Sequence, residues 1–398
     1  MKRNTYTYTL GETEINLEFS KIAEQASTSL IARAGDTMVL ATATMSENDS
    51  SMPFFPLRVD VEERFSAGGK ILGSRFMRRE GRPSDEATLM ARLIDRTIRP
   101  LFDQRSRRDT QVVITVLSVD GENPVDAIAL VAASAALHCS SIPHGGPFSG
   151  VRIAQIDGKM VVNPTRSQYD NKERDFSLVA AGPKGRINMI EFEGNEATEE
   201  VVFEALKKGQ EEIDKLCAFV EEVHAKEGNE KEEIVIPWIS DEAQSLITPL
   251  VASMGEGALF GASRKERKAA EDTLKEAATK ALVEKEIEEP SNLVGAFIDG
   301  ELKKMVMSQA LDNKRRMDGR SMDVVRDLEA EVGLLPRTHG SSLFLRGSTQ
   351  SLGTATLGAP GSEQLLENIR EGAVKERFML HYNFPPYSTG SVGPFRSA

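Results

Sequence analysis

Cysteine, histidine and tryptophan are scarce in this chain of 398 residues, which contains two, five and one of them. Two cysteines, Cys139 and Cys217, cannot form a disulfide framework, and so low a number fits the reducing cytoplasm. His138, Cys139 and His144 come nearest to a metal-ligand cluster, but no second pair completes them. We therefore predict a helix end followed by a loop at this place, and no metal site.

Long hydrophobic runs and a phosphate-binding P-loop are also missing. The longest nearly apolar stretch, residues 127–137, is too short to cross a bilayer and predicts a buried helix. The basic N-terminus is not followed by an apolar segment, so the sequence predicts no signal peptide and no membrane partner. No G-x-x-x-x-G-K-[ST] motif is present. With 40% hydrophobic and 28% charged residues, the composition is that of a soluble globular protein of two or three domains.

Positive charge is concentrated in one segment, although the whole chain has a formal net charge of −12. From Arg64 to Arg108 there are 12 Lys or Arg residues and 5 Asp or Glu residues, a local excess of +7. Such segregation indicates a binding surface for a polyanion. Within the segment, the stretch "RFMRREGRPS" (75–84) places four arginines around Phe76 in a glycine-punctuated loop.

A helix is predicted directly after this loop. Ser84 is suited to the N-cap and Pro100 to the end of the helix. Arg92, Arg96 and Arg99 fall on one face of it, opposite an apolar face. A solvated helix face with local ion pairs is the alternative, but the arginine-rich loop directly before the helix favours phosphate binding.

Single-stranded nucleic acid is the ligand that these residues favour. Lys and Arg contact phosphates regardless of sequence, and a neighbouring aromatic ring adds a base-stacking surface of about 1–3 kcal/mol per base. No recognition helix or ribbon for a duplex is evident. The residues expected to contact the ligand are Phe76, Arg78, Arg79, Arg82, Arg92, Arg96 and Arg99.

An internal repeat links the two ends of the chain. Residues 29–45 and 341–357 align without a gap at an offset of 312, and both read as a hairpin with a Gly-containing turn. Residues 56–68 and 379–390 resemble each other in the same order, which favours a duplicated domain. The second copy stops soon after its turn, so we expect this chain to be a fragment or one half of a split protein.

The fold class predicted from these patterns is α/β (α+β). Residues between the copies are rich in Ala, Glu and Lys with helical periodicity, which predicts an all-helical connecting domain. The expected domains are a first core with mixed sheets and helices over 1–237, the helical domain over 238–316, and an incomplete second core over 317–398.

Several long motifs resemble the bacterial polynucleotide phosphorylase family (polyribonucleotide nucleotidyltransferases). They are "GRPSDEATLMARLIDRTIRPLF" (81–102), "NPT" (163–165), "RMDGRSMDVVRDLEAEVGLLPRTHGSSLF" (316–344) and "HYNFPPYS" (381–388). The resemblance covers nearly the whole chain and implies a first RNase PH-like core, a helical domain and the opening of a second RNase PH-like core.

The resemblance implies a 3′-to-5′ exoribonuclease that acts by phosphorolysis. Inorganic phosphate is the co-substrate, Mg²⁺ assists, and nucleoside diphosphates are released from RNA. It further implies a cytoplasmic homotrimer that takes part in mRNA degradation, with RNA degradosome components as possible partners. Phe76, Arg78 and Arg79 match the family's RNA-gripping pore loop, and Arg92 and Arg96 match arginines that approach RNA.

The family's catalytic centre and its Mg²⁺ ligands are expected beyond Ala398, so no catalytic residue is assigned in this chain. In the first core, Glu122 and Pro124 stand where the family's second core has phosphate-binding serines, and Ser177 stands where it has a lysine. We therefore expect a first core that grips RNA and is not catalytic. The alternatives are a non-catalytic RNA-binding fragment or scaffold half of a split enzyme and, less favoured, a subunit contact or small-anion site.

Overall fold

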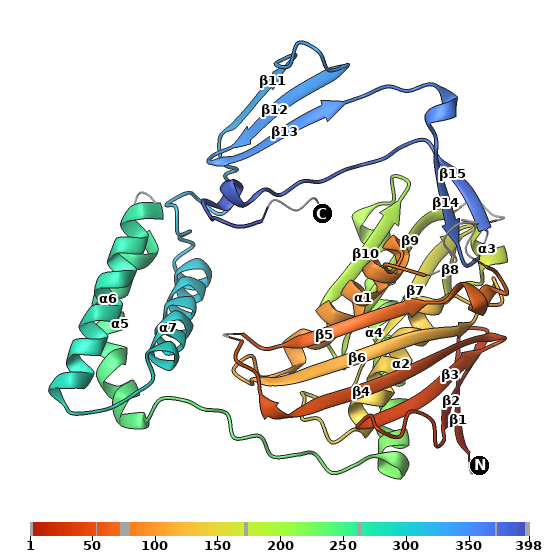
Figure 1. Ribbon diagram of the computed structural model, residues 1–398, viewed down its shortest axis with the longest axis horizontal. Helices are drawn as coiled ribbons and strands as arrows, with labels where there is room; N and C mark the ends of the chain where they lie inside the picture. The colour runs from red at the N-terminus through yellow and green to blue at the C-terminus, as the bar shows by residue number, and fades with distance from the viewer. Residues whose placement is uncertain are drawn as a thin grey trace. The chain divides into compact units, whose positions relative to one another are not determined.

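The computed structural model describes residues 3–52, 54–71, 80–170, 174–260, 264–370 and 372–394 (Figure 1). The chain divides into two compact units. The first unit consists of Met1–Val235 together with Ser362–Ala398, and the second unit is Ile236–Gly361. Among the described helices, none has the length and apolar character needed to cross a membrane.

A six-stranded sheet forms one layer of the first unit, in the order β1-β2-β3-β4-β6-β5. Neighbouring strands are antiparallel except for β5 and β6, which are parallel. In β4, every second side chain from Thr37 to Ala43 is buried, as expected for a sheet that packs one face against a core. The strands are β1 Asn4–Leu10, β2 Thr13–Phe19, β3 Thr28–Ala34, β4 Thr37–Asp49, β5 Leu57–Glu63 and β6 Arg108–Ser118.

A four-stranded antiparallel sheet in the order β10-β9-β7-β8 forms a second layer. Its strands are β7 Phe148–Ile156, β8 Lys159–Val162, β9 Arg174–Pro183 and β10 Met189–Gly194. The helices of this unit are α1 Asp85–Ile98, α2 Val125–Cys139, α3 Arg166–Asp170 and α4 Glu199–Glu227, with one-turn 3₁₀ helices at Phe65–Gly68 (η1) and Arg99–Leu101 (η2).

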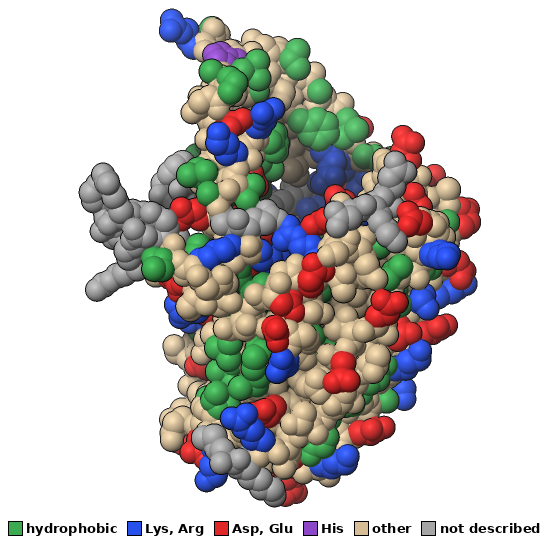
Figure 2. All heavy atoms as spheres, turned by 90° about the vertical axis from the view of Figure 1, so that its right-hand side faces the viewer, with side chains coloured by type: hydrophobic (Ala, Val, Ile, Leu, Met, Phe, Trp, Pro, Cys, Tyr) green, Lys and Arg blue, Asp and Glu red, His purple; other side chains and the backbone are tan. Residues whose placement is uncertain are grey.

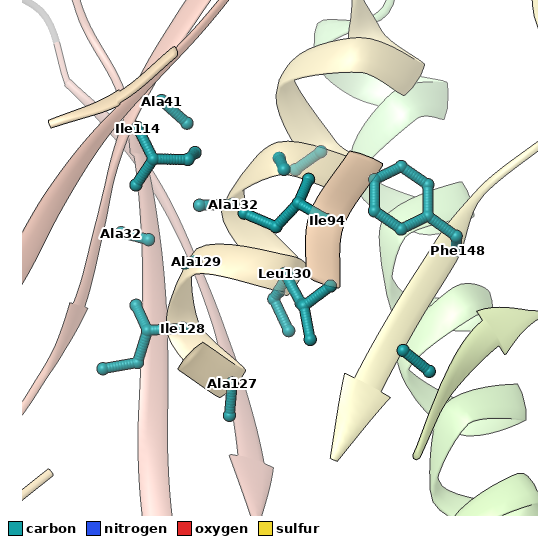
Figure 3. Close-up of a cluster of buried hydrophobic side chains, with 14 of the residues drawn as sticks. Ala32, Ala41, Ile94, Ile114, Ala127, Ile128, Ala129, Leu130, Ala132 and Phe148 are labelled. Atoms are coloured by element: carbon teal, nitrogen blue, oxygen red, sulfur yellow. The ribbon is translucent and has the colours of Figure 1, made fainter. Parts of the chain in front are cut away.

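Helix α2 lies between the two sheets and is buried along its whole length, which confirms the buried helix predicted from the apolar stretch. It ends at Cys139, where the sequence predicted a helix end. Figure 3 shows its small side chains, such as Ala129 and Ala132, near Ala32 and Ala41 of the sheet. Because alanine leaves little bulk, the helix backbone can approach the sheet closely.

The last segment of the chain also belongs to the first unit. It contains the hairpin of β14 Gln364–Asn368 and β15 Gly372–Glu376, and η4 Pro386–Thr389, and it follows η3 Pro360–Ser362 at the boundary between the units. Ile369, in the hairpin turn, is only 3% exposed and packs in the core of the first unit. The hairpin therefore contacts the first unit by burying an apolar side chain in it.

In its described residues, the second unit contains three helices and a three-stranded antiparallel sheet. Its elements are α5 Asp241–Phe260, α6 Arg264–Glu284, α7 Ser291–Asp312, β11 Leu328–Val332, β12 Gly340–Arg346 and β13 Thr349–Ala355. The helices pack around a core that includes Ile247, Leu274 and Ile298. The expectation of helices after residue 238 is confirmed.

The predicted internal repeat is confirmed in the backbone. The pairs Thr28↔Ala43 of β3–β4 and Gly340↔Ala355 of β12–β13 differ by the offset of 312 found in the sequence. The turns of these hairpins contain Gly35 and Gly347, whose φ values are +57° and +58°. Both copies later form a one-turn 3₁₀ helix, η1 or η4, capped by a left-handed glycine.

Candidate nucleic-acid interface

Helix α1 carries the arginines that the sequence singled out. The Ser84 hydroxyl accepts a hydrogen bond from the Ala87 N–H at 3.0 Å, which confirms the predicted N-cap. Leu93 and Ile94, on the predicted apolar face, are buried. The helix is therefore fixed to the core by its apolar face, and its opposite face is left to solvent.

Arg92 and Arg96 are exposed on that outer face. Neither side chain forms a hydrogen bond or ion pair with another residue in the described part of the chain. Two uncompensated guanidinium groups one helical turn apart can contact neighbouring phosphates of a flexible strand. Arg82, just before the helix, is exposed as well.

Arg99 has a different environment from the other two. Its Nη2 lies 2.5 Å from Asp95 Oδ1, its Nε donates to Asp95 Oδ2 at 2.9 Å, and Nη2 also donates to the Leu57 carbonyl at 3.1 Å. These contacts tie α1 to β5. Phe76, Arg78 and Arg79 lie outside the described residues.

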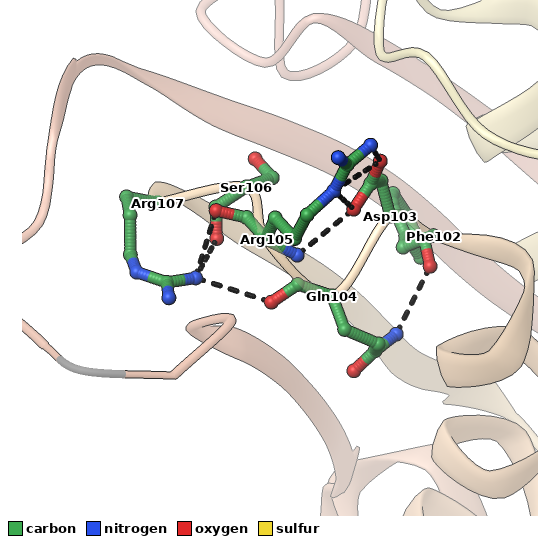
Figure 4. A network of polar contacts seen from close by, with 6 residues as sticks. All are labelled: Phe102, Asp103, Gln104, Arg105, Ser106 and Arg107. Atoms are coloured by element: carbon green, nitrogen blue, oxygen red, sulfur yellow. Dashed lines mark hydrogen bonds and ion pairs between the residues drawn. The ribbon is translucent and has the colours of Figure 1, made fainter. Parts of the chain in front are cut away.

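Other cations of the basic segment also have internal partners. Arg105 pairs with Asp103 at 2.6 Å, and Nη1 of Arg107 donates to the carbonyls of Gln104, Arg105 and Ser106 (Figure 4). The hydrogen bond from Arg105 outweighs partial burial and keeps the pKa of Asp103 below its usual value. On the face drawn in Figure 2, basic and acidic side chains are interspersed. Part of the local positive charge therefore stabilises the fold.

A cleft of about 420 Å³ lies beside α1, on the side away from Arg92. It is lined by α1, the loop before α2, Arg152 of β7, helix α3 with the residues before it, and the β14–β15 turn. Arg92 instead borders a shallower groove between α1 and β5, so the structure does not place the predicted arginines in the cleft. Arg92 and Arg96 lie on the solvent side of α1.

Asp126, which is buried, and Arg152, which is partly exposed, form an ion pair inside the cleft. Burial alone would raise the pKa of Asp126, but the charge and hydrogen bond of Arg152, with the Ala127 N–H, keep it below its usual value. Arg152 also donates to the Ser177 hydroxyl at 3.0 Å. Ser177, which stands where the family resemblance implies a lysine, is therefore bound to this arginine.

Two further acids at the cleft are also engaged. Glu122 accepts hydrogen bonds from the Ser167 hydroxyl at 2.5 Å and the Ser167 N–H at 3.1 Å, which lower its pKa. Asp170 pairs with Arg166 at 2.7 Å. Within the described residues, no group of three or more His, Cys, Asp or Glu side chains could hold a metal ion.

Asp120 positions the loop in front of α2 and was missed by the sequence reasoning. Its carboxylate accepts hydrogen bonds from the Thr37 hydroxyl at 2.9 Å and from the N–H groups of Glu122 and Asn123, both at 2.8 Å. Although burial opposes it, these bonds lower the pKa of Asp120 to about 2. The stretch "DGEN" was a possible signal, since Asp often accepts bonds from the backbone that follows it. No comparable sequence motif pointed to Arg152 or Arg370.

The family models support the predicted duplication. Residues 13–143 and 324–397 match the 3′ exoribonuclease family, domain 1, and residues 146–212 match domain 2 of the same family. The two stretches that match domain 1 contain the two copies of the repeat.

Curated relatives are similar along nearly the whole chain. A polyribonucleotide nucleotidyltransferase of Anoxybacillus flavithermus is 44% identical over 383 residues, 96% of this chain and 54% of that protein. A protein of the same name from Bacillus subtilis strain 168 is 41% identical over 399 residues, 99% of this chain and 56% of its own length. The chain thus spans about half the length of the curated relatives it matches.

Among solved structures, rice Rrp46 matches 53% of this chain and 94% of its own, with 15% identity and a TM-score of 0.43, too distant a likeness to add to the assignment. The family models and the curated relatives confirm the resemblance that the motifs predicted. The chain belongs to the 3′ exoribonuclease family.

Proposed function

We propose that this protein takes part in the 3′-to-5′ phosphorolysis of single-stranded RNA, as a polyribonucleotide nucleotidyltransferase, and that its first unit holds the RNA. The observation that carries the RNA-holding role is the pair Arg92 and Arg96, which α1 presents to solvent without a described partner. Family membership supports the reaction class.

Phosphorolysis transfers one nucleotide at a time to inorganic phosphate. A phosphate oxygen attacks the terminal phosphorus in line, and the bond from that phosphorus to the 3′ oxygen of the preceding nucleotide breaks. A nucleoside diphosphate leaves, and the shortened RNA carries a 3′ hydroxyl. The reaction brings anions together, so it depends on positioning and charge neutralisation.

We propose that the cleft of the first unit does not carry out this chemistry. A phosphate would meet the carboxylate of Glu122 near the N-terminus of α2, and Pro124 has no N–H to donate. Asp126 and Asp170 are already paired with arginines. The described residues do not fit Mg²⁺, the ion that the family resemblance implies, so no step of this proposal uses it.

The alternative function is RNA binding without turnover, and the paired acids of the cleft favour it. The test is to incubate uniformly labelled single-stranded RNA with the chain, inorganic phosphate and Mg²⁺, and to measure both binding and nucleoside diphosphate release. Binding with release supports phosphorolysis by residues outside this cleft, and binding without release supports the alternative. If the RNA is not bound, both proposals are wrong.

A matched pair of variants tests the surface itself. Replacing Arg92 and Arg96 together by alanine should weaken RNA binding and reduce the slope of log K against log salt by about 1.4, since each lost single-strand phosphate contact contributes about 0.7. Arg99→Ala removes the same kind of side chain from a position paired within the fold, and should leave the slope unchanged. An unchanged slope in the double variant would exclude these contacts.

Assembly and cellular role are further parts of the proposal. We infer from the family resemblance a cytoplasmic homotrimer that acts in mRNA degradation and meets components of the RNA degradosome. Sedimentation equilibrium gives the oligomeric state directly, and a monomer at micromolar concentration would contradict trimer formation by this chain.

A further inference from the structure

The turn between β14 and β15 packs against the residues that precede the arginine-rich loop. Ile369 of this turn is buried in the core of the first unit. Its carbonyl oxygen comes so near to Gly68 that a Cβ added there would lie 2.1 Å away, closer than any side chain tolerates. Gly68 is thus required by the close approach of this turn and not by its own backbone dihedral angles.

The same turn contacts residues on both sides of the arginine-rich loop. Lys70, which precedes the loop, donates from Nζ to the Arg370 carbonyl at 2.5 Å. The Arg370 guanidinium lies 3.6 Å from the carboxylate of Glu86, in the first turn of α1 after the loop. Asn368 Oδ1 accepts from the Arg370 N–H at 3.0 Å and so stabilises the turn itself.

Arg82 lies between these two contacts, and Arg92 and Arg96 follow on α1. Binding RNA costs less conformational entropy when the residues that carry such side chains are already fixed. The Asn368–Arg370 turn fixes the residues around Lys70 and the start of α1 from a distant part of the chain, on the side of α1 that lines the cleft.

We propose that Ile369 and Arg370 are positioning residues for RNA binding: they hold Lys70 and the start of α1 at a fixed separation. This inference rests on the proposed function. It couples the RNA surface of the first copy of the repeat to a hairpin that belongs to the second copy, without requiring the hairpin to touch RNA.

The effect of Glu86→Ala on RNA affinity separates positioning from simple electrostatics. Removing an acid beside a phosphate-binding surface should strengthen RNA binding if charge alone matters. The positioning role predicts the opposite: Glu86→Ala and Arg370→Ala should each weaken binding of a labelled oligoribonucleotide by roughly threefold, the size expected for a half-exposed ion pair. The exchanged pair, Glu86→Arg with Arg370→Glu, should restore much of the affinity.

Salt dependence and a matched control complete the experiment. Arg370→Ala should leave the salt slope unchanged, whereas a direct phosphate contact would lower it by about 0.7. Arg377→Ala is the control, because Arg377 follows the same hairpin and pairs with Glu363 at 2.8 Å, away from Lys70 and Glu86. It removes the same charge and should not change the affinity.

Amide hydrogen exchange tests, without RNA, whether the turn fixes the residues on both sides of the arginine-rich loop. Amides of residues 65–70 and 80–90 should exchange faster in Arg370→Ala than in the unaltered chain or in Arg377→Ala. Unchanged exchange, a stronger binding by Glu86→Ala, or a lowered salt slope in Arg370→Ala would each overturn the inference. If the unaltered chain bound no RNA, the proposed function would fail, and faster exchange would still establish that the turn fixes these segments.

Discussion

The two hairpins of the internal repeat, β3–β4 and β12–β13, share a register and a turn but differ in burial. Leu30 and Ala32 of the first hairpin are fully buried, and α2 packs against their strands. In the second hairpin, Phe344 is 45% exposed and Leu352 is 58% exposed. Register and turn therefore follow from local sequence, whereas burial depends on a helix packed against the sheet.

Matched leucine substitutions should show the largest difference between the two hairpins. Leu30→Ala should lower the free energy of unfolding by about 2–5 kcal/mol because it leaves a cavity in a closed core, and Leu352→Ala should change it by less than about 0.5 kcal/mol. Urea unfolding followed by circular dichroism measures both. Trp238, the single tryptophan, reports on the second unit by fluorescence. Equal losses would show that the second hairpin is also covered.

The turn glycines give a second comparison at nearly identical backbone geometry. Gly35→Ala should destabilise the first unit by about 3 kcal/mol, since the new Cβ would lie 2.4 Å from Asn123 Nδ2 in addition to the cost of a positive φ. Gly347→Ala meets only the flexible Arg326 side chain, at 3.2 Å, and should cost about 1 kcal/mol. The same unfolding experiment applies, and similar losses would indicate that the Asn123 contact relaxes.

Lowering the pH should change the free energy of unfolding of the two units by different amounts. Three histidines gather near the end of α2: the ring centre of His138 lies 5.4 Å from that of His144 and 4.5 Å from that of His224. Burial lowers the pKa of His144 to about 3, and burial lowers the pKa of His138 despite the nearby Glu221. Lys231 opposes protonation of both.

Because the folded pKa of His144 lies below its unfolded value of about 6.5, the unfolded chain binds more protons. The stabilisation is complete above about pH 6.5 and is lost as the pH falls below it, by about 2 kcal/mol at pH 5 for His144 alone. Urea unfolding at pH 7 and pH 5 should show this loss in the first unit, and His144→Phe should reduce it. A pH-independent first unit would contradict the prediction.

The smallest effect compares two arginines on one helix. Arg99→Ala should cost about 1 kcal/mol of stability, because it removes a bidentate ion pair and a bond to the Leu57 carbonyl. Arg92→Ala should cost almost nothing, since Arg92 has no described partner. Thermal unfolding of the two variants side by side checks this, and equal losses would assign Arg92 a structural role too.

The sequence predicted the elements whose causes are local. The Ser84 cap, the buried α2, the helices after residue 238 and the register of the repeat all follow from periodicity, capping and turn residues. The sequence could not show whether Arg92 or Arg99 would form the ion pair with Asp95. Side chains on a helix lean toward its N-terminus, so Arg99 reaches back one turn to Asp95, while Arg92 points away from it.

Contacts between distant parts of the chain could not be predicted from the sequence. The Asp126–Arg152 pair joins a helix to a strand, and Arg370 reaches Glu86 across most of the chain. The grouping of residues 362–398 with the first unit likewise follows from packing, because it depends on where Ile369 is buried. The domain boundaries at 237 and 316 stay predictions, as do the RNA contacts of Phe76, Arg78 and Arg79.

Both thiols of the chain are enclosed in the first unit, Cys139 at the end of α2 and Cys217 within α4, and burial raises the pKa of each to about 12. A maleimide or iodoacetamide label can react with them only while that unit is transiently open. The rate of alkylation therefore measures how often the first unit opens.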